Sequence, residues 1–172
     1  GPPLKLQNTF LMSINKTLPG PQVVSRKIIV NDAIVSSAAG PQFGLTQPAN
    51  SIIEKIFVRV LEAPVLGTGG DIGLEIGTET SAPFDNIIVN ATGDDNLLDG
   101  GTTLPVNTLF ELTAGTANTT WAGQGLATGD ASSETASNLV TVDTDINLQF
   151  TTSVAVTTAG KFEVSFVFRV FE

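Results

Sequence analysis

The chain of 172 residues contains no cysteine, no histidine and no tyrosine, and it has a single tryptophan. Without cysteine, neither a disulfide framework nor a thiolate metal site can form. Without histidine, the chain lacks the side chain that most often transfers protons near neutral pH and binds metals. Serine triads, zinc hydrolases and facial-triad iron sites are therefore excluded in their usual forms. We expect no catalytic residues, no metal and no cofactor, and we keep a carboxylate-only hydrolase as a third hypothesis.

Long apolar runs are also missing, because no run approaches the roughly 20 residues needed to cross a bilayer. No secretory leader is recognisable, so we expect no membrane partner. Gly1-Pro2 resembles the remnant of a cleaved expression tag and is set aside in considering the fold. The length suits a single domain with a sizeable core.

Basic residues are scarce and unevenly placed along the chain. Residues 1–60 carry a net charge of +4, residues 61–160 carry −13 with no lysine or arginine, and the last twelve residues balance, which gives −9 for the chain. Such a field repels nucleic acid over most of the surface. In one interpretation, the net negative charge only keeps the protein soluble. In the other, a basic N-terminal part contacts something acidic while an acidic body faces water.

Glycine is concentrated in GTGGDIGLEIGTETS, residues 67–81, which raises the possibility of a phosphate-binding loop. The offsets of the glycines do not fit G-x-G-x-x-G, since Ile72 falls where the third glycine belongs, and the Lys-Ser/Thr pair of a P-loop is absent. Ile72, Leu74 and Ile76 instead alternate with polar or small residues, with the period of two of a half-buried strand. We therefore interpret residues 64–70 as a turn and 72–77 as a strand.

The same period predicts strands elsewhere and no amphipathic helix. We expect strands at 23–30, 52–62, 87–90 and 104–112, and a long closing hairpin in which residues 146–156 and 162–170 are joined by a turn at 158–161. The predicted fold class is all-β, an antiparallel β-sandwich of jelly-roll type. Residues 1–22, with four prolines, form an extended N-terminal arm, and residues 23–172 form the single sandwich domain.

Two loops carry the remaining candidate sites. Residues 114–138 are almost all small, so we predict a long surface loop whose one large apolar group, Trp121, either covers an end of the sandwich or anchors a neighbouring subunit or a glycan. The acidic turn at 93–101 offers Asp94, Asp95 and Asp99 as weak calcium candidates. Leu98 breaks the EF-hand order, so an ordinary solvated turn is the alternative.

The segments IEKIFVRVLEA, GTGGDIGLEIGTETS, NLLDGG and VAVTTAGKFEVSFVFRV resemble the β-sandwich decoration or cement proteins that coat tailed-phage heads. The resemblance covers about residues 50–172 and contains no catalytic signature. It implies a non-enzymatic virion structural protein on the capsid exterior, made in the host cytoplasm, with the major capsid protein and further copies of itself as partners. It also implies trimers, and an N-terminal segment that contacts the capsid.

The alternative function is a carbohydrate-binding, lectin-like sandwich or a module of a host-attachment fibre. Sugar sites usually contain several aromatic side chains, and this chain has one tryptophan and no tyrosine. Apolar residues on both sides of the last strand, such as Phe166 and Val167, predict that a neighbouring copy or the arm covers its second side, and a trimer is the favoured assembly. Lys5, Phe10 and Lys16 make the arm the expected contact with the capsid or an adjacent subunit. The arm could instead pair with the edge of its own sandwich.

Overall fold

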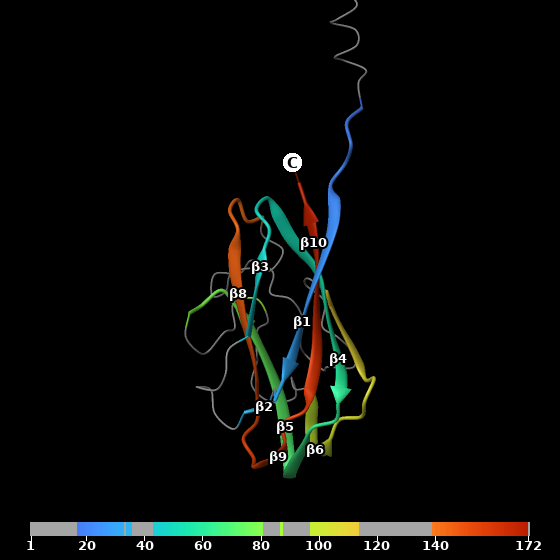
Figure 1. Ribbon diagram of the computed structural model, residues 1–172, viewed down its shortest axis with the longest axis vertical. Helices are drawn as coiled ribbons and strands as arrows, with labels where there is room; N and C mark the ends of the chain where they lie inside the picture. The colour runs from blue at the N-terminus through green and yellow to red at the C-terminus, as the bar shows by residue number, and fades with distance from the viewer. Residues whose placement is uncertain are drawn as a thin grey trace, which may run out of the picture.

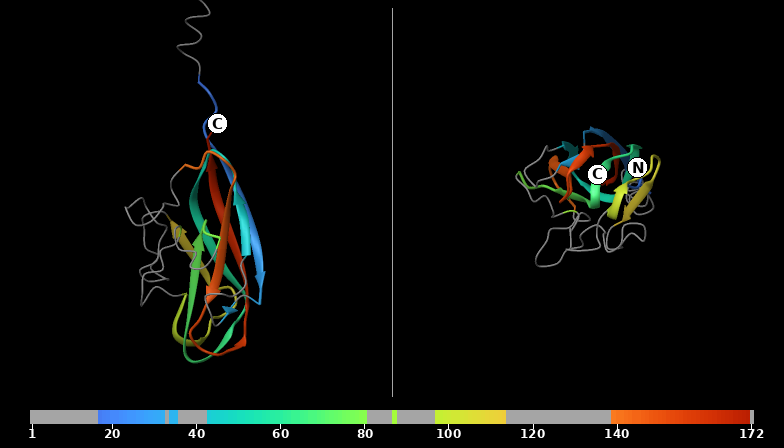
Figure 2. Two further views of the ribbon diagram at one scale, coloured as in Figure 1. Left: turned by 90° about the vertical axis from the view of Figure 1, so that its left-hand side faces the viewer. Right: turned by 90° about the horizontal axis from the view of Figure 1, so that it is seen from below.

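The computed structural model describes residues 17–32, 34–35, 43–80, 87, 97–113 and 139–171. Within these ranges the chain contains ten β-strands and no helix, arranged as two sheets that pack face to face (Figure 1). The prediction of an all-β sandwich is therefore confirmed. The longer strands run along the long axis of the sandwich in both side views (Figures 1 and 2), and in the view from below they are seen nearly end on.

We call the four-stranded sheet the first sheet. Its strands, in spatial order, are β1 (Gln22–Asn31), β10 (Lys161–Val170), β4 (Ser51–Glu62) and β7 (Leu109–Thr113), and all its pairings are antiparallel.

The six-stranded sheet is the second sheet. Its central path is β2 (Ile34–Val35), β8 (Thr144–Thr151), β5 (Val65–Gly77) and β6 (Leu98–Thr103), with β3 (Phe43–Gln47) paired to β8 and β9 (Val156–Thr158) paired to β5. Only the two-residue β2 pairs in parallel among these strands. The strand order of the two sheets is compatible with the predicted jelly roll, which stays a prediction.

Alternation of side chains explains why these segments form strands that bury one side. In β4, Ile56, Val58 and Val60 are fully buried, while Lys55 and Arg59 project from the opposite side. In β10, the buried side is made by phenylalanine and valine at every second position, namely Phe162, Val164, Phe166 and Phe168. The predicted strands at 23–30 and 52–62 are confirmed within a residue at each end.

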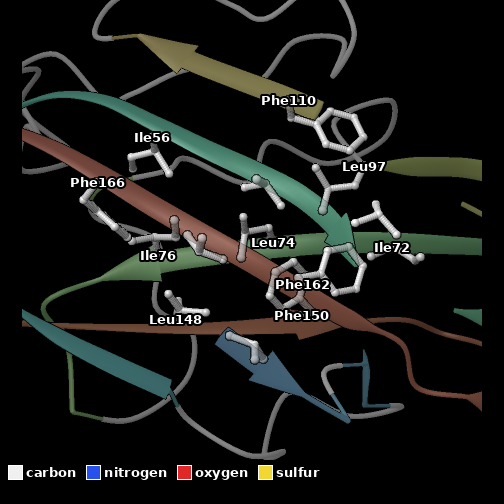
Figure 3. Packing of buried hydrophobic residues seen from close by; sticks show 14 of the residues in the cluster. Ile56, Ile72, Leu74, Ile76, Leu97, Phe110, Leu148, Phe150, Phe162 and Phe166 are labelled. Atoms are coloured by element: carbon white, nitrogen blue, oxygen red, sulfur yellow. The ribbon is translucent and has the colours of Figure 1, made fainter. Parts of the chain in front are cut away.

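The core lies between the two sheets and is wholly apolar at its centre (Figure 3). Phe150 from β8 stacks on Phe162 from β10, with ring centroids 4.4 Å apart and planes inclined by 25°. Ile72, Leu74 and Ile76 of β5 fill the space beside them. Each such side chain contributes about 1.5–3 kcal/mol of burial free energy, so the core holds the two sheets together.

The predicted closing hairpin is wrong. β8 belongs to the second sheet and β10 to the first, so the two strands face each other across the core and do not pair. Between them, β9 pairs with β5, and the chain crosses from one sheet to the other before Lys161. β10 instead pairs along its whole length with β1 and β4. Alternation identifies which side of a strand is buried. It does not tell whether a second strand pairs with it in the same sheet or packs against it from the opposite sheet, so the pattern could not exclude the hairpin.

Three strand boundaries also differ from the prediction. Residues 65–70 continue β5 with register irregularities and do not form a separate turn. Residues 98–101, which belong to the acidic turn expected at 93–101, instead lie in β6. The strand predicted at 104–112 starts only at Leu109 because Pro105 lacks a backbone N–H and Asn107 has a positive φ of 68°.

The remaining predictions on organisation fall largely on residues outside the described ranges. Of the predicted arm, residues 17–22 are described, and Gln22 already belongs to β1. The predicted loop at 114–138 lies outside the described residues, as does all but Ile87 of the strand predicted at 87–90. The described part of the glycine-rich stretch, residues 67–80, lies in and just after β5, and no helix begins within it, which contradicts the phosphate-loop alternative.

Candidate binding surface

Basic side chains gather on one sheet of the sandwich. Every basic residue in the described part of the chain lies on β1, β4 or β10 of the first sheet, and these residues are Arg26, Lys27, Lys55, Arg59, Lys161 and Arg169. The strands of this sheet carry four acidic residues, so their net charge is +2. The strands of the second sheet carry four acidic residues and no basic residue. The fold therefore separates charge between the two sheets, because the strands of the first sheet are net positive and those of the second sheet are net negative.

Strand geometry places five of the six basic residues on the outer side of the first sheet. Lys27, Lys55, Arg59, Lys161 and Arg169 each neighbour a residue packed in the core, and successive side chains point to opposite sides of a strand. Arg26 is different, because it lies in register with the buried Phe166 and projects at the exposed edge of β1. We call this outer side, with its ion pairs and the apolar residues between them, the basic face.

Glu163 is the centre of an ion-pair cluster on the basic face. Its carboxylate lies 3.3 Å from the Arg59 guanidinium on one side and 3.5 Å from the Lys27 ammonium on the other. The hydrogen bond donated by Arg59, together with the charges of Arg59 and Lys27, lowers the pKa of Glu163 below its ordinary value of 4.5 against the opposing effect of desolvation. Two cations share this one carboxylate, so the cluster keeps a net positive charge.

Two more ion pairs extend the cluster along the sheet. Lys55 Nζ lies 2.9 Å from Glu111 and 6.0 Å from the centre of the Phe57 ring. Arg169 Nε donates to Glu54, and this hydrogen bond raises the pKa of Arg169. Exposed pairs of this kind add little to stability, because water and salt screen them. Their main consequence is that they order long side chains on an otherwise open sheet.

Apolar side chains lie between these charges and remain open to solvent. Val23, Ile29 and Leu109 are exposed large hydrophobic residues on β1 and β7, and Phe57 and Val167 are half-buried on the central strands. The basic face thus mixes apolar contact area with fixed charge, as protein-protein interfaces do.

The outer side of the second sheet is different at its centre, where polar groups are buried. Gln149 is fully buried, and its Nε2 donates to Glu75 Oε2 at 2.7 Å, while its Oε1 has no hydrogen-bond partner among the described residues. Among the described residues, no group of three or more side chains of the metal-ligating types lies close enough to hold an ion.

A hollow of about 480 Å³ lies at the end of the sandwich where β1 begins and β10 ends. It is lined by Leu18, Pro19, Gly20, Pro21, Gln22, Val24, Val170 and Phe171. We call it the arm groove, because most of its lining comes from the predicted arm. None of these described lining residues carries a charged side chain.

Most of the sequence-predicted site residues are not placed by the structure. Lys5, Phe10, Lys16 and Trp121 lie outside the described residues, as do Asp94 and Asp95. Asp99 is exposed in β6, one residue from Gly100, whose N–H donates to Asp71. Calcium binding and arm-mediated contacts therefore stay predictions.

Sequence reasoning did not single out Arg59 and Glu163 as a pair. Alternation could have placed each of them on the outer side of its strand. Their direct opposition depends on the pairing of β4 with β10, which the sequence pattern does not contain.

No helix in the described ranges is long and apolar enough to cross a membrane. No protein-family model matches the chain, and no curated protein matches it in sequence.

Two solved structures are similar in shape. A chain of the capsid asymmetric unit of cyanophage Pam1 has a TM-score of 0.48 and 13% sequence identity, with 91% of this chain and 95% of that chain covered. A chain of the capsid of Ralstonia phage GP4 has a TM-score of 0.46 and 11% identity, with 94% of each chain covered. Both TM-scores lie below 0.5, so the likeness assigns neither a family nor a role to this chain.

Proposed function

We propose that the protein is a non-enzymatic virion structural protein that decorates and stabilises the outer surface of a phage capsid as an oligomer, with a trimer as the favoured form. The observation that supports this most is the gathering of all described basic side chains on one exposed sheet. The first sheet docks on an acidic shell surface, and the acidic remainder of the chain faces water.

The net charge of the whole chain is the reason why only the basic first sheet can face an acidic shell. At a net charge of −9, the protein is repelled by an acidic surface unless its basic side turns toward that surface. The basic face offers this approach, and Val23, Ile29 and Leu109 supply apolar area to bury once contact is made.

The chemistry available to the chain supports a structural role. A sequence without histidine, cysteine or tyrosine offers few groups for acid-base or nucleophilic work. The resemblance of residues 50–172 to phage decoration proteins supports the same role, whereas the likeness to the two solved phage capsid chains is too low to add support. A protein that binds only the assembled shell stabilises that shell by mass action.

Co-sedimentation with undecorated phage heads tests the proposal. We compare the wild type with Lys27→Gln/Lys161→Gln on the basic face and with the matched control Thr102→Asp/Thr157→Asp on exposed positions of β6 and β9. Both double variants change the net charge by −2. We expect the lysine variant to bind about tenfold more weakly and the control to bind like the wild type, with binding that weakens as salt rises.

Two results would overturn this reasoning. Wild-type protein that fails to sediment with heads at every salt concentration contradicts the function itself. Equal weakening by the two double variants contradicts docking through the basic face, because net charge alone would then explain the binding.

A further inference from the structure

Strand β1 forms a long open edge of the first sheet. Its ten residues pair with β10, its one partner among the described strands, in a continuous antiparallel register without a bulge. β1 is the blue strand at the right-hand margin in the left view of Figure 2. Seven of its ten residues are exposed, and they include Val23 at 53% and Ile29 at 41%. This edge is therefore accessible to another chain.

The backbone of β1 determines what kind of group can bind at this edge. In an antiparallel ladder, residues alternate between turning both backbone groups toward the partner strand and turning both away from it. About half of the N–H and C=O groups of β1 consequently point away from β10. An extended chain satisfies such groups in register, as strands added to a sheet edge do. The occupant that matches this edge is a strand-like segment.

The charges of β1 disfavour a second copy of the same strand. β1 carries Arg26 and Lys27 at its centre and no acidic residue. If the first sheet continued into a second copy through β1, the two antiparallel registers with the greatest overlap would place Arg26 opposite Arg26 or Lys27 opposite Lys27. Like charges directly opposite each other destabilise a strand pair. The edge therefore repels its own copy and favours an acidic strand.

The charge of the neighbouring strands favours this edge of the sheet over the opposite one. β1 and β10 together carry four basic residues and one acidic residue, a net charge of +3. β4 and β7 carry two basic and three acidic residues, a net charge of −1. The other edge of the first sheet, at β7, thus lies in its negative half, so an acidic segment is attracted to β1.

We propose that the β1 edge binds an extended acidic segment of a shell subunit, which joins the first sheet as a further strand. Two consecutive acidic residues of this segment lie opposite Arg26 and Lys27, which project to opposite sides of β1. Apolar residues nearer its ends lie opposite Val23 and Ile29, on the same side of the sheet as Lys27. This inference deepens the proposed function, because it rests on the acidic shell named there and adds a strand contact to docking through the basic face.

Hydrogen exchange of the backbone amides of residues 22–31 in the full chain, followed by NMR, tests the proposal. The probe is a synthetic ten-residue peptide of alternating threonine and valine with a central Asp-Glu pair, and the control peptide has Asn-Gln in its place. We expect the acidic peptide to slow those amides of β1 that exchange rapidly in the free protein. We expect the control peptide to need a concentration about threefold higher or more for the same effect.

Two protein variants identify the charges that select the peptide. In Arg26→Gln/Lys27→Gln, the preference for the acidic peptide should disappear. It should persist in Thr102→Asp/Thr157→Asp, which changes the net charge equally at exposed positions of β6 and β9. Unchanged exchange of the amides of β4 shows that both variants are folded.

The outcomes separate this inference from the proposed function. Slow exchange of all β1 amides in the free protein, or no slowing by either peptide, overturns the edge site. Equal slowing by the two peptides overturns the acidic occupant. With undecorated heads as the probe, protection of the same amides supports a shell segment as the occupant, and binding to heads without that protection overturns it. Slowing by the acidic peptide, combined with no binding to heads, supports the edge site and overturns the proposed function.

Discussion

Replacing Phe150 and Phe162 by leucine, singly and together, measures the contact that joins the two sheets. Both rings are fully buried, and they stack at 4.4 Å from strands in opposite sheets. We expect each single substitution to cost about 1–2 kcal/mol of unfolding free energy, below the roughly 3–5 kcal/mol of a Phe→Ala change, because leucine fills part of the space. The double-mutant cycle should show a coupling of about 0.5–1.5 kcal/mol, as expected for an aromatic pair.

The control cycle pairs Phe150 with Phe168. Phe168 lies six residues further along β10 than Phe162, which is roughly 20 Å at the rise of a strand. We expect additivity for this pair within about 0.5 kcal/mol. Urea unfolding at constant temperature provides the free energies, provided that the slope with denaturant is the same for all variants.

The two cycles distinguish the sandwich from a closing hairpin. A hairpin that turned at 158–161 would bring Phe150 beside the far end of the last strand, near Phe168, and away from Phe162. Coupling of Phe150 with Phe168 and none with Phe162 would therefore refute the arrangement in which β8 and β10 belong to opposite sheets.

Two further predictions concern a turn and the ion-pair cluster. Gly160 has a φ of 78°, and an added Cβ would lie 3.0 Å from Pro64 Cβ, so Gly160→Ala should cost about 2 kcal/mol or more. Gly69→Ala has a similar φ but open space and should cost about 1–2 kcal/mol, and equal thermal shifts would contradict the crowding argument. Because Glu163 has a lowered pKa, its contribution to stability should be present above pH 4.5 and disappear as pH falls through its folded-state pKa. The stability difference between wild type and Glu163→Gln should shrink accordingly in urea titrations from pH 7 to 3, and a difference that is constant with pH would contradict this.

Period-two alternation predicted which side of each long strand is buried. The buried residues of β4 and β10 are those that the pattern selected, because covering one side of a half-buried sheet requires apolar residues at every second position. The prediction of an all-β sandwich followed from several such segments and the absence of a helical period.

Strand partners could not be predicted in the same way. A phenylalanine at position 150 satisfies alternation equally well beside β10 or across the core from it, and chain proximity favoured the hairpin wrongly. Residues 65–70 show a related limit: their glycines suggested a turn, but glycine also occurs in strands where the register is irregular, as it is in β5 between Val65 and Ile72.

The candidate site depended on these same long-range pairings. In the sequence, Lys161 and Arg169 lie about a hundred residues from the basic N-terminal part, separated from it by a segment with no basic residue. Pairing β10 between β1 and β4 places them beside Lys27, Lys55 and Arg59.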